Sequence, residues 1–404
     1  MISPLPIPTL PDAPLLDGGG WTSVPGARCG IARGPIKPTT RSPDVAVLLA
    51  PGVAAGVTTR STAAAAPCRW CRDRLPGFVQ AMVVNAGNAN ASTGPQGIAD
   101  VLETARVAAD ALGCSPDEVL ISSTGVIGVP LPMDRLLSAV QAAASAPSAS
   151  GLDAARAIMT TDLVAKQAAV RIEGITVGGM AKGSGMIHPD MATMLAFVAA
   201  DVRVAPDDLQ ALVADVAKRT FNAITVDGDM STNDTLTVHA IGQGPAIAPG
   251  DAQWDAFARG VEVVCRTLSQ AIARDGEGAN HLLAVSVAGA SDDATARRAA
   301  RAIARSPLVK SALHGHDPNW GRIVGALGAV GVPGLERLDL DLAGVPVLRG
   351  GAPVGGWNES QASANMKEDT VQITARLSNG AGVGWAWGCD LSADYVRINA
   401  DYRS

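Results

Sequence analysis

Aromatic side chains are scarce in this 404-residue chain: they make up 3% of it, although 47% of its residues are hydrophobic. No run of about 18 apolar residues is free of Gly, Pro or charge, which is roughly the length that a membrane-spanning helix needs. A core without many rings must be built from closely packed Ala, Val, Leu and Ile. We therefore expect a soluble protein without a membrane partner, in which backbone segments approach one another closely.

Positive charge is missing from the beginning of the chain, where the first Lys or Arg is Arg28 and five of the first 14 residues are proline. A secretory signal needs a basic start and an apolar helix, so we expect a cytoplasmic protein whose first 27 residues form an irregular arm over the surface. Asp and Glu (38) outnumber Lys and Arg (32), and the formal net charge is −6. This balance argues against nucleic acid as a partner.

Cysteine is sparse, with six residues spread along the chain, so we expect reduced thiols rather than a disulfide framework. Cys68 and Cys71 form a lone CxxC pair, which supplies half of a tetrahedral zinc site. The close pair His314 and His316 would have to complete it. Two ordinary thiols are the simpler interpretation, and we expect no metal.

Apolar periodicity alternates between the two regular structures along the chain. It predicts buried strands at 44–57, 78–84, 118–123 and 194–202, an alternating strand at 172–177, and helices at 98–112, 152–165, 206–217 and 291–306. Gly113 is the residue type that closes a helix, and it follows the first of these helices. A glycine-dense turn is expected at 178–185. The pattern indicates a mixed α/β fold.

Lys182 lies among glycines, which first raises the possibility of a phosphate-binding loop. Such a loop needs Lys followed by Ser or Thr and then a helix, whereas Gly183 follows Lys182 and a strand follows the loop. Nucleotide binding is therefore disfavoured. The segment 227–229 (DGD) invites a calcium interpretation, but the twelve-residue loop with its closing Glu is absent, so we expect a structural turn.

Thr193 stands at the first position of an expected buried strand, directly after the small residue Ala192. A threonine hydroxyl is a weak nucleophile and needs a base, and one solution is the threonine's own α-amino group, freed by cleavage of the preceding peptide bond. That amine has a pKa of about 7.7–8.0, close enough to neutrality to accept a proton. Residue type alone leaves a purely structural Thr193 open, because threonine is common in strands.

The segment 182–197 (KGSGMIHPDMATMLAF) resembles the self-cleavage segment of the ornithine acetyltransferase family, also called glutamate N-acetyltransferase. Seven further segments resemble family motifs in family order, so the resemblance covers all but about the first 45 residues and some loops. These segments are 85–91 (NAGNANA), 123–128 (STGVIG), 159–162 (MTTD), 226–235 (VDGDMSTNDT), 275–279 (DGEGA), 317–322 (DPNWGR) and 395–403 (YVRINADYR).

The resemblance implies a proenzyme that cuts itself before Thr193 into an α chain, 1–192, and a β chain, 193–404. It further implies a four-layer α/β/β/α sandwich with a smaller C-terminal α/β subdomain from about 283 to 404, an α2β2 heterotetramer, and no metal, cofactor or prosthetic group. The implied reaction moves an acetyl group from N2-acetylornithine to glutamate through an acetyl-threonine ester. Acetyl-coenzyme A as a second donor stays open.

The family's functional positions fall on particular residues of this sequence. Thr193 matches the nucleophile, and Thr124 with Gly125 matches the oxyanion site. Lys182 and Glu277 match substrate-binding positions, where we assign the lysine to a carboxylate and the glutamate to an ammonium. The other matches to substrate-binding positions are Thr160 or Thr161, Asn399 and the C-terminal Ser404.

Each of these residues also has a structural interpretation: Glu277 as a solvated turn carboxylate, Lys182 as a surface lysine, Thr124 and Gly125 as a turn cap. The sequence departs from the family at Asp190, where Asn is usual, and at Asn280 and His281, where Thr and Lys are usual. Two alternatives therefore stay open: a self-processed amidohydrolase or aminopeptidase, and a relative in a specialised pathway with another acyl donor or acceptor.

Overall fold

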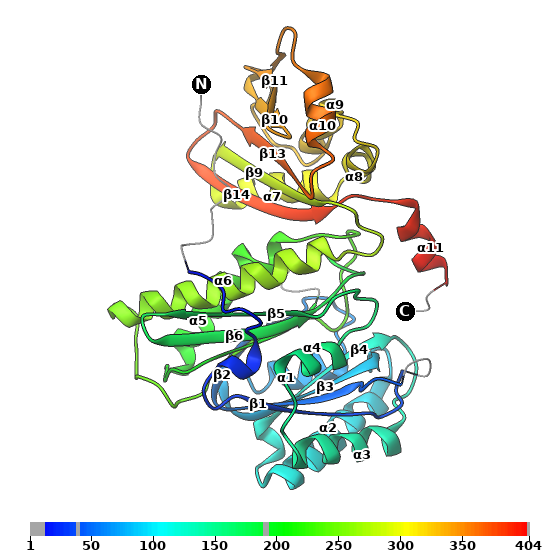
Figure 1. Cartoon of the computed structure of the whole chain (residues 1–404), viewed down its shortest axis with the longest axis vertical. Helices are drawn as coiled ribbons and strands as arrows, with labels where there is room; N and C mark the ends of the chain where they lie inside the picture. The colour runs from blue at the N-terminus through cyan, green and yellow to red at the C-terminus, as the bar shows by residue number, and fades with distance from the viewer. Residues whose placement is uncertain (1–12, 38–40, 189–193, 402–404) are drawn as a thin grey trace. The chain divides into compact units, whose positions relative to one another are not determined.

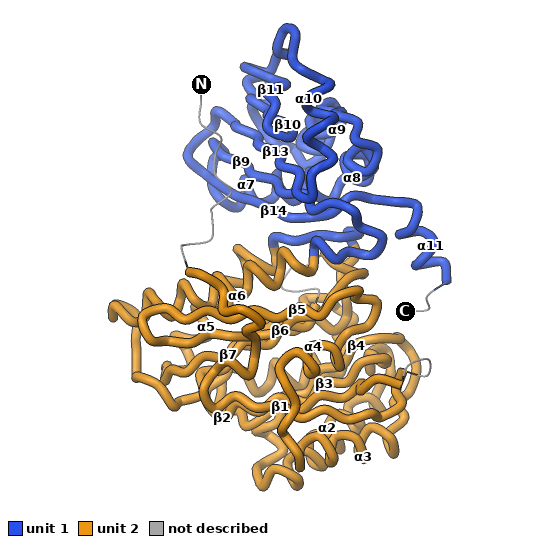
Figure 2. Tube along the Cα trace, in the orientation of Figure 1, with its two compact units in different colours: residues 1–9, 223–228, 273–402 blue, residues 10–222, 229–272, 403–404 orange. Residues whose placement is uncertain are grey.

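The structure is a computed structural model that describes residues 13–37, 41–188 and 194–401 (Figure 1). Within these residues the chain divides into two compact units (Figure 2). The larger unit contains 13–222 and 229–272, and the smaller unit contains 223–228 and 273–401. Each unit is a mixed sheet with helices packed on it, as the expected α/β pattern requires.

The larger unit is built on an eight-stranded sheet in the order β4-β3-β2-β8-β7-β6-β5, with β1 paired to β2. The β3–β4 and β7–β8 pairs are parallel and the other pairs are antiparallel. Its strands are β1 (Arg28–Ala32), β2 (Val45–Thr58), β3 (Gly77–Asn88), β4 (Val119–Val126), β5 (Lys166–Ile172), β6 (Ile175–Lys182), β7 (Leu195–Ala200) and β8 (Thr235–Ala240).

The long strand β2 changes partners along its length. Its first half pairs with β1 through Leu49, and its second half pairs with β8 from Val53. The register against β3 shifts between Leu49 and Gly52, and Pro51 lies in this irregularity. Proline lacks the N–H of a ladder hydrogen bond, so a bulge is where a central strand tolerates it.

Helices α2 and α3 pack on this sheet through small residues. Buried alanines such as Ala105, Ala108 and Ala109 line the apolar face of α2, and Gly113 caps the helix in the left-handed conformation at φ 69°. The helix expected at 98–112 is thus confirmed, one turn longer at its start. The helices of the larger unit are α1 (Ala66–Arg72), α2 (Gly94–Leu112), α3 (Met133–Ser145), α4 (Gly151–Ala157), α5 (Pro206–Arg219) and α6 (Ala252–Arg274), the last ending two residues beyond the unit boundary.

Three expectations need correction. The helix expected at 152–165 is α4, which already ends at Ala157. The strand expected at 172–177 is instead the β5–β6 hairpin, which turns through Glu173 and Gly174, both at positive φ. The described part of the opening arm does not merely cover the surface, because the Trp21 side chain is completely buried in the core.

The glycine-dense turn expected at 178–185 is also wrong in its first half, because Gly178 and Gly179 are part of the fully buried strand β6. A Cβ atom on Gly178 would lie 2.3 Å from the Gly20 carbonyl oxygen, and one on Gly179 would lie 2.5 Å from the Phe197 carbonyl oxygen. These glycines serve close backbone approach rather than a turn. The turn itself begins at Gly183.

The smaller unit has a six-stranded sheet in the order β12-β11-β10-β13-β9-β14. Helix α7 matches the helix expected at 291–306; the Asp292 carboxylate caps its N-terminus by accepting the Thr295 N–H. The elements of this unit are β9 (Leu282–Ala290), α7 (Asp293–Arg305), α8 (Pro307–His314), α9 (Trp320–Ala329), β10 (Asp339–Leu342), β11 (Val345–Arg349), β12 (Ala352–Pro353), α10 (Glu359–Asn365), β13 (Thr370–Arg376), β14 (Gly382–Cys389) and α11 (Ala393–Asp401). Of the helices described in either unit, none has the length and apolarity to cross a membrane.

Candidate active site

The C-terminal ends of the parallel strands β3 and β4 form a tight glycine corner in the larger unit. Gly87 pairs with Gly125, and the register is disturbed next to this pair at Asn88. Gly125 has φ +133°, and a Cβ atom there would lie 2.2 Å from the Gly87 carbonyl carbon. Only glycine allows the two backbones to meet in this way. The corner fixes the position of the neighbouring Thr124.

Hydrogen bonds from asparagine side chains support this glycine corner. Ser123 Oγ donates to Asn85 Oδ1 at 2.6 Å, and Asn85 Nδ2 donates to the Asn88 carbonyl at 2.9 Å. Asn233 Nδ2 donates to the Ser123 carbonyl at 2.8 Å and also to that of Ala89. Three sequence motifs, 85–91, 123–128 and 226–235, therefore meet in one buried hydrogen-bond network that supports Thr124.

Lys182, at the end of β6, places its ammonium group between two threonine hydroxyls. Its Nζ donates to Thr124 Oγ1 at 3.1 Å and to Thr160 Oγ1 at 2.7 Å, and the residue is only 7% exposed. The ammonium has no acceptor capacity, so both hydroxyls must accept from it and keep their own protons for donation elsewhere. Between the two threonines left open by the sequence, the geometry favours Thr160, since no Lys182 contact to Thr161 is found among the described residues.

Asp162 provides a negative charge near Lys182. It forms a buried ion pair with Lys166 at 2.7 Å, and its carboxylate also accepts the Gly183 N–H at 2.7 Å and the Thr160 N–H at 3.0 Å. Burial raises the pKa of Asp162, but the charges of Lys182 and Lys166 and the hydrogen bonds from Lys166 and Gly183 outweigh it and lower the pKa to about 2. Asp162 was not among the site residues predicted from the sequence, although its position in the 159–162 motif was a signal.

Glu277 and Asn399 lie in the smaller unit and contact each other. Asn399 Nδ2, on α11, donates to Glu277 Oε2 at 2.8 Å, and Glu277 is 7% exposed. A solvated turn carboxylate would be far more exposed, so the structural interpretation of Glu277 loses support. The structure thus brings together Thr124, Thr160 and Lys182 in one unit, and Glu277 and Asn399 in the other.

Asp390 fixes the loop that follows Glu277. Its buried carboxylate accepts the backbone N–H groups of Asn280 and His281 at 2.7 and 3.0 Å, and it pairs with His314 Nδ1 at 2.8 Å. Burial raises the pKa of Asp390, yet these hydrogen bonds outweigh it and hold the pKa below its ordinary value. The two positions that depart from the family pattern, Asn280 and His281, are therefore anchored through their backbone.

The potential metal ligands named from the sequence are divided between the two units. Cys68 and Cys71 are buried in the larger unit, where burial raises the pKa of both thiols, and His314 and His316 belong to the smaller unit. Throughout the described ranges, no group of three or more His, Cys, Asp or Glu residues is arranged to hold a metal ion.

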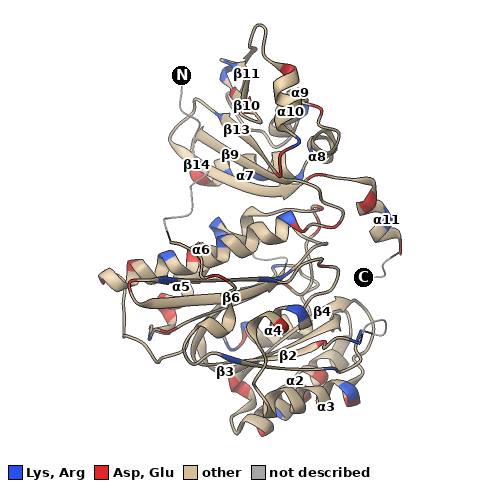
Figure 3. Ribbon diagram, in the orientation of Figure 1, with Lys and Arg blue, Asp and Glu red and all other residues tan. Residues whose placement is uncertain are grey.

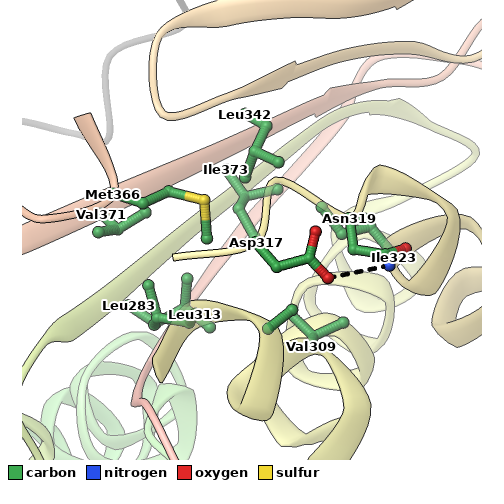
Figure 4. A pocket seen from close by; sticks show the side chains of 11 residues that line it. Leu283, Val309, Leu313, Asp317, Asn319, Ile323, Leu342, Met366, Val371 and Ile373 are labelled. Carbon is green, nitrogen blue, oxygen red and sulfur yellow. Dashed lines mark hydrogen bonds between the residues drawn. The ribbon is translucent and has the colours of Figure 1, made fainter. Parts of the chain in front are cut away.

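A cavity in the smaller unit is too small and too apolar for an amino-acid substrate. It has a volume of about 10 Å³, enough for roughly one water molecule, and its walls are core side chains such as Leu283, Met366 and Ile373 (Figure 4). Its polar residues, Asp317 and Asn319, are hydrogen-bonded to each other at 3.2 Å. It belongs to the core rather than to a binding site.

Three residues that the sequence analysis assigned to the chemistry, Ala192, Thr193 and Ser404, lie outside the described residues, as does Asp190. Their assignments stay predictions. The described part of the site ends at His188 and resumes at Met194, which precedes β7.

These features define a class: a mixed α/β protein in which a lysine-bound threonine and a glycine corner lie at the ends of parallel strands. The ArgJ family model matches residues 27–404, and the chain belongs to this family, which confirms the family expected from the motifs.

Two similar proteins cover most of the chain, and a crystal structure covers about half of it. The arginine biosynthesis bifunctional protein ArgJ of Thermosynechococcus vestitus is 47% identical over 413 residues, covering 96% of this chain and 98% of that protein. The protein of the same name from Symbiobacterium thermophilum is 50% identical and covers 89% and 92%. The crystal structure of the Bacillus halodurans arginine biosynthesis bifunctional protein argJ is 42% identical with a TM-score of 0.50, and covers 51% of this chain and 98% of that one.

Proposed function

We propose that this protein is a glutamate N-acetyltransferase of arginine biosynthesis that moves an acetyl group from N2-acetylornithine to glutamate. Thr193, with its amine freed by self-cleavage after Ala192, attacks the acetyl carbonyl, ornithine leaves, and glutamate takes the acetyl group from the threonine ester. Family membership over residues 27–404 and the high identity to arginine biosynthesis proteins support this reaction.

The geometry at Thr124 is the observation that carries the proposal. The Thr124 hydroxyl accepts a hydrogen bond from Lys182 and so can donate its own proton to another acceptor. The adjacent positive charge polarises that O–H and makes it a better donor. A hydroxyl donor beside a backbone corner is what a tetrahedral acyl intermediate needs, because negative charge develops on its oxygen.

Self-cleavage has support from the length of the crystallised relative. The Bacillus halodurans chain is almost completely covered, yet it corresponds to only 51% of this chain. A chain of about half length is what processing near the middle would produce. We infer an α chain of 1–192 and a β chain of 193–404 that stay together as an α2β2 heterotetramer in the cytoplasm, with the four-layer α/β/β/α sandwich and the C-terminal subdomain of the family.

We infer that Glu277, with Asn399 beside it, binds the ammonium of the substrate side chain, because a poorly exposed carboxylate needs a positive partner. The Lys182 ammonium, which Thr160 helps to hold, serves the substrate carboxylate. Ser404 supplies a further hydroxyl in this proposal. The chemistry needs no metal or cofactor, because the acetyl group is carried by Thr193 itself.

Incubation of the purified protein with N2-acetylornithine, with and without glutamate, tests this function. Transfer predicts acetylglutamate only when glutamate is present. A self-processed amidohydrolase would instead release acetate at the same rate with or without glutamate, which would contradict the proposal. Acetylglutamate from glutamate and acetyl-coenzyme A would show a second donor.

A further inference from the structure

Lys37 is a charged residue that lies beside the candidate site and has no role in the reaction proposed above. The loop that carries it is clamped by the buried carboxylate of Asp44, which accepts the backbone N–H groups of Gly34 at 2.6 Å, Ile36 at 2.7 Å and Lys37 at 3.0 Å. With its carboxylate satisfied by three backbone donors, Asp44 holds the Lys37 backbone in one position.

The stem of Lys37 crosses the glycine corner. A Cβ atom on Gly87 would lie 2.8 Å from Lys37 Cγ and 3.0 Å from its backbone nitrogen, and Gly87 is the partner of Gly125. The aliphatic part of Lys37 therefore occupies the space that a side chain on Gly87 would fill. Because Gly87 pairs with Gly125, this contact places the stem of Lys37 next to the predicted oxyanion site at Thr124 and Gly125.

The Lys37 ammonium has few partners. Its one hydrogen bond is to the Ala157 carbonyl, at a long 3.4 Å, and among the described residues no carboxylate lies within ion-pair distance of it. Burial lowers the pKa of Lys37, and the positive charge of Lys182 lowers it further; the charges of Asp44 and Asp162 raise it but do not outweigh these effects. A half-buried ammonium next to a second lysine is costly unless an anion joins it.

Asp44 and Asp162, the described carboxylates that act on the pKa of Lys37, already have hydrogen-bond donors. Asp162 is already satisfied by Lys166 and two backbone N–H groups, and Asp44 by its loop. Among the described residues, neither of these carboxylates forms an ion pair with the Lys37 ammonium. An anionic ligand group would neutralise the Lys37 ammonium.

We propose that Lys37 is a substrate-binding residue that pairs with the α-carboxylate of the amino-acid substrate and shares this anion with Lys182. Both the donor and the acceptor of the proposed reaction carry an α-carboxylate, so one cationic pair serves both half-reactions. The inference rests on the proposed function and adds to it the group that recognises the carboxylate.

The test compares Lys37→Met and Lys37→Arg with the wild type on two donors: N2-acetylornithine and N-acetyl-1,4-diaminobutane, the same molecule without its carboxylate. Losing one charge-assisted hydrogen bond should raise KM for N2-acetylornithine by about 10–100-fold in K37M, with a smaller change in kcat. K37R keeps the charge and should recover much of the loss. The exposed Lys218→Met on α5 is the matched control and should behave like the wild type.

On the donor that lacks a carboxylate, K37M and the wild type should react alike. An equal loss on both donors, or unchanged KM for N2-acetylornithine, would overturn the role of Lys37. Intact mass and the thermal midpoint of each variant show whether it is folded and cleaved, and Lys37→Gln offers a second neutral side chain if K37M does not fold. Failure of the wild type to transfer acetyl at all would instead refute the proposed function.

Discussion

At the scale of single residues, Thr124 tests the proposed electrostatic site most sharply. Thr124→Val removes the hydroxyl but keeps the branched shape, so kcat should fall by about 100–1000-fold while KM changes little, because the donor acts mainly on the transition state. Steady-state kinetics of protein shown by mass to be fully cleaved would measure this effect.

Thr124→Ser is the matched control, since it keeps a hydroxyl within reach of Lys182, and it should retain most of the activity. If T124V matched the wild type in kcat, Thr124 would be a turn residue and the oxyanion would be stabilised elsewhere.

A second residue, His239, is expected to make the stability of the protein depend on pH. It is completely buried on β8, and burial lowers its pKa from 6.5 to about 4. Between pH 6.5 and 4 the unfolded chain therefore binds more protons than the folded one. The contribution of His239 to the free energy of unfolding is fully present above pH 6.5 and is lost as the pH falls through this window. The loss reaches about 3 kcal/mol at pH 4.

Urea unfolding between pH 4 and 7 would reveal this loss, and His239→Gln, which cannot titrate, should flatten the slope. The Asp162 window lies lower, from its ordinary 3.8 to about 2, and does not overlap. An unchanged slope in H239Q would show that other groups cause the pH dependence.

Individual site residues were predictable from the sequence to different degrees. Lys182 and Glu277 stand in recognisable motifs, and in the structure both are buried and have polar partners. Asp390 and Lys37 were not predictable, because their importance comes from contacts with residues far away in the chain. Asp390 reaches back 110 residues to Asn280, and no local pattern carries such information.

At the scale of elements, strand β6 shows why glycine misled the sequence analysis. Gly178 and Gly179 resemble a turn in one dimension, but in the fold they let β6 lie against the neighbouring backbone. Helices with strong apolar spacing, such as α2 and α7, were predicted well because their periodicity comes from one buried face.

Substitution of these glycines separates the two interpretations. Gly178→Ala places a Cβ atom 2.3 Å from a carbonyl oxygen and should destabilise the protein by about 1–3 kcal/mol. Gly325→Ala in α9 meets nothing within 4 Å and should stabilise its helix by up to about 1 kcal/mol. Thermal unfolding of both variants measures the contrast, and a neutral G178A would mean that β6 has room that the structure does not show.

At the scale of the whole molecule, the proposed self-cleavage would turn one polypeptide into two chains. The mixed α/β class follows from alternating periodicity, whereas the division at residues 222–229 and 272–273 does not, because the 223–228 segment joins the smaller unit only through tertiary contacts such as Thr225 with Trp387. The ArgJ family match extends through both units, which is why we treat them as parts of one enzyme.

The most direct measurement is the intact mass of the purified protein after brief exposure to N2-acetylornithine. We predict two fragments, the heavier beginning at Thr193 and gaining the mass of one acetyl group, and a Thr193→Ala variant that stays uncut. A polypeptide that remains continuous from residue 192 to 193 and still transfers acetyl to glutamate would contradict this prediction.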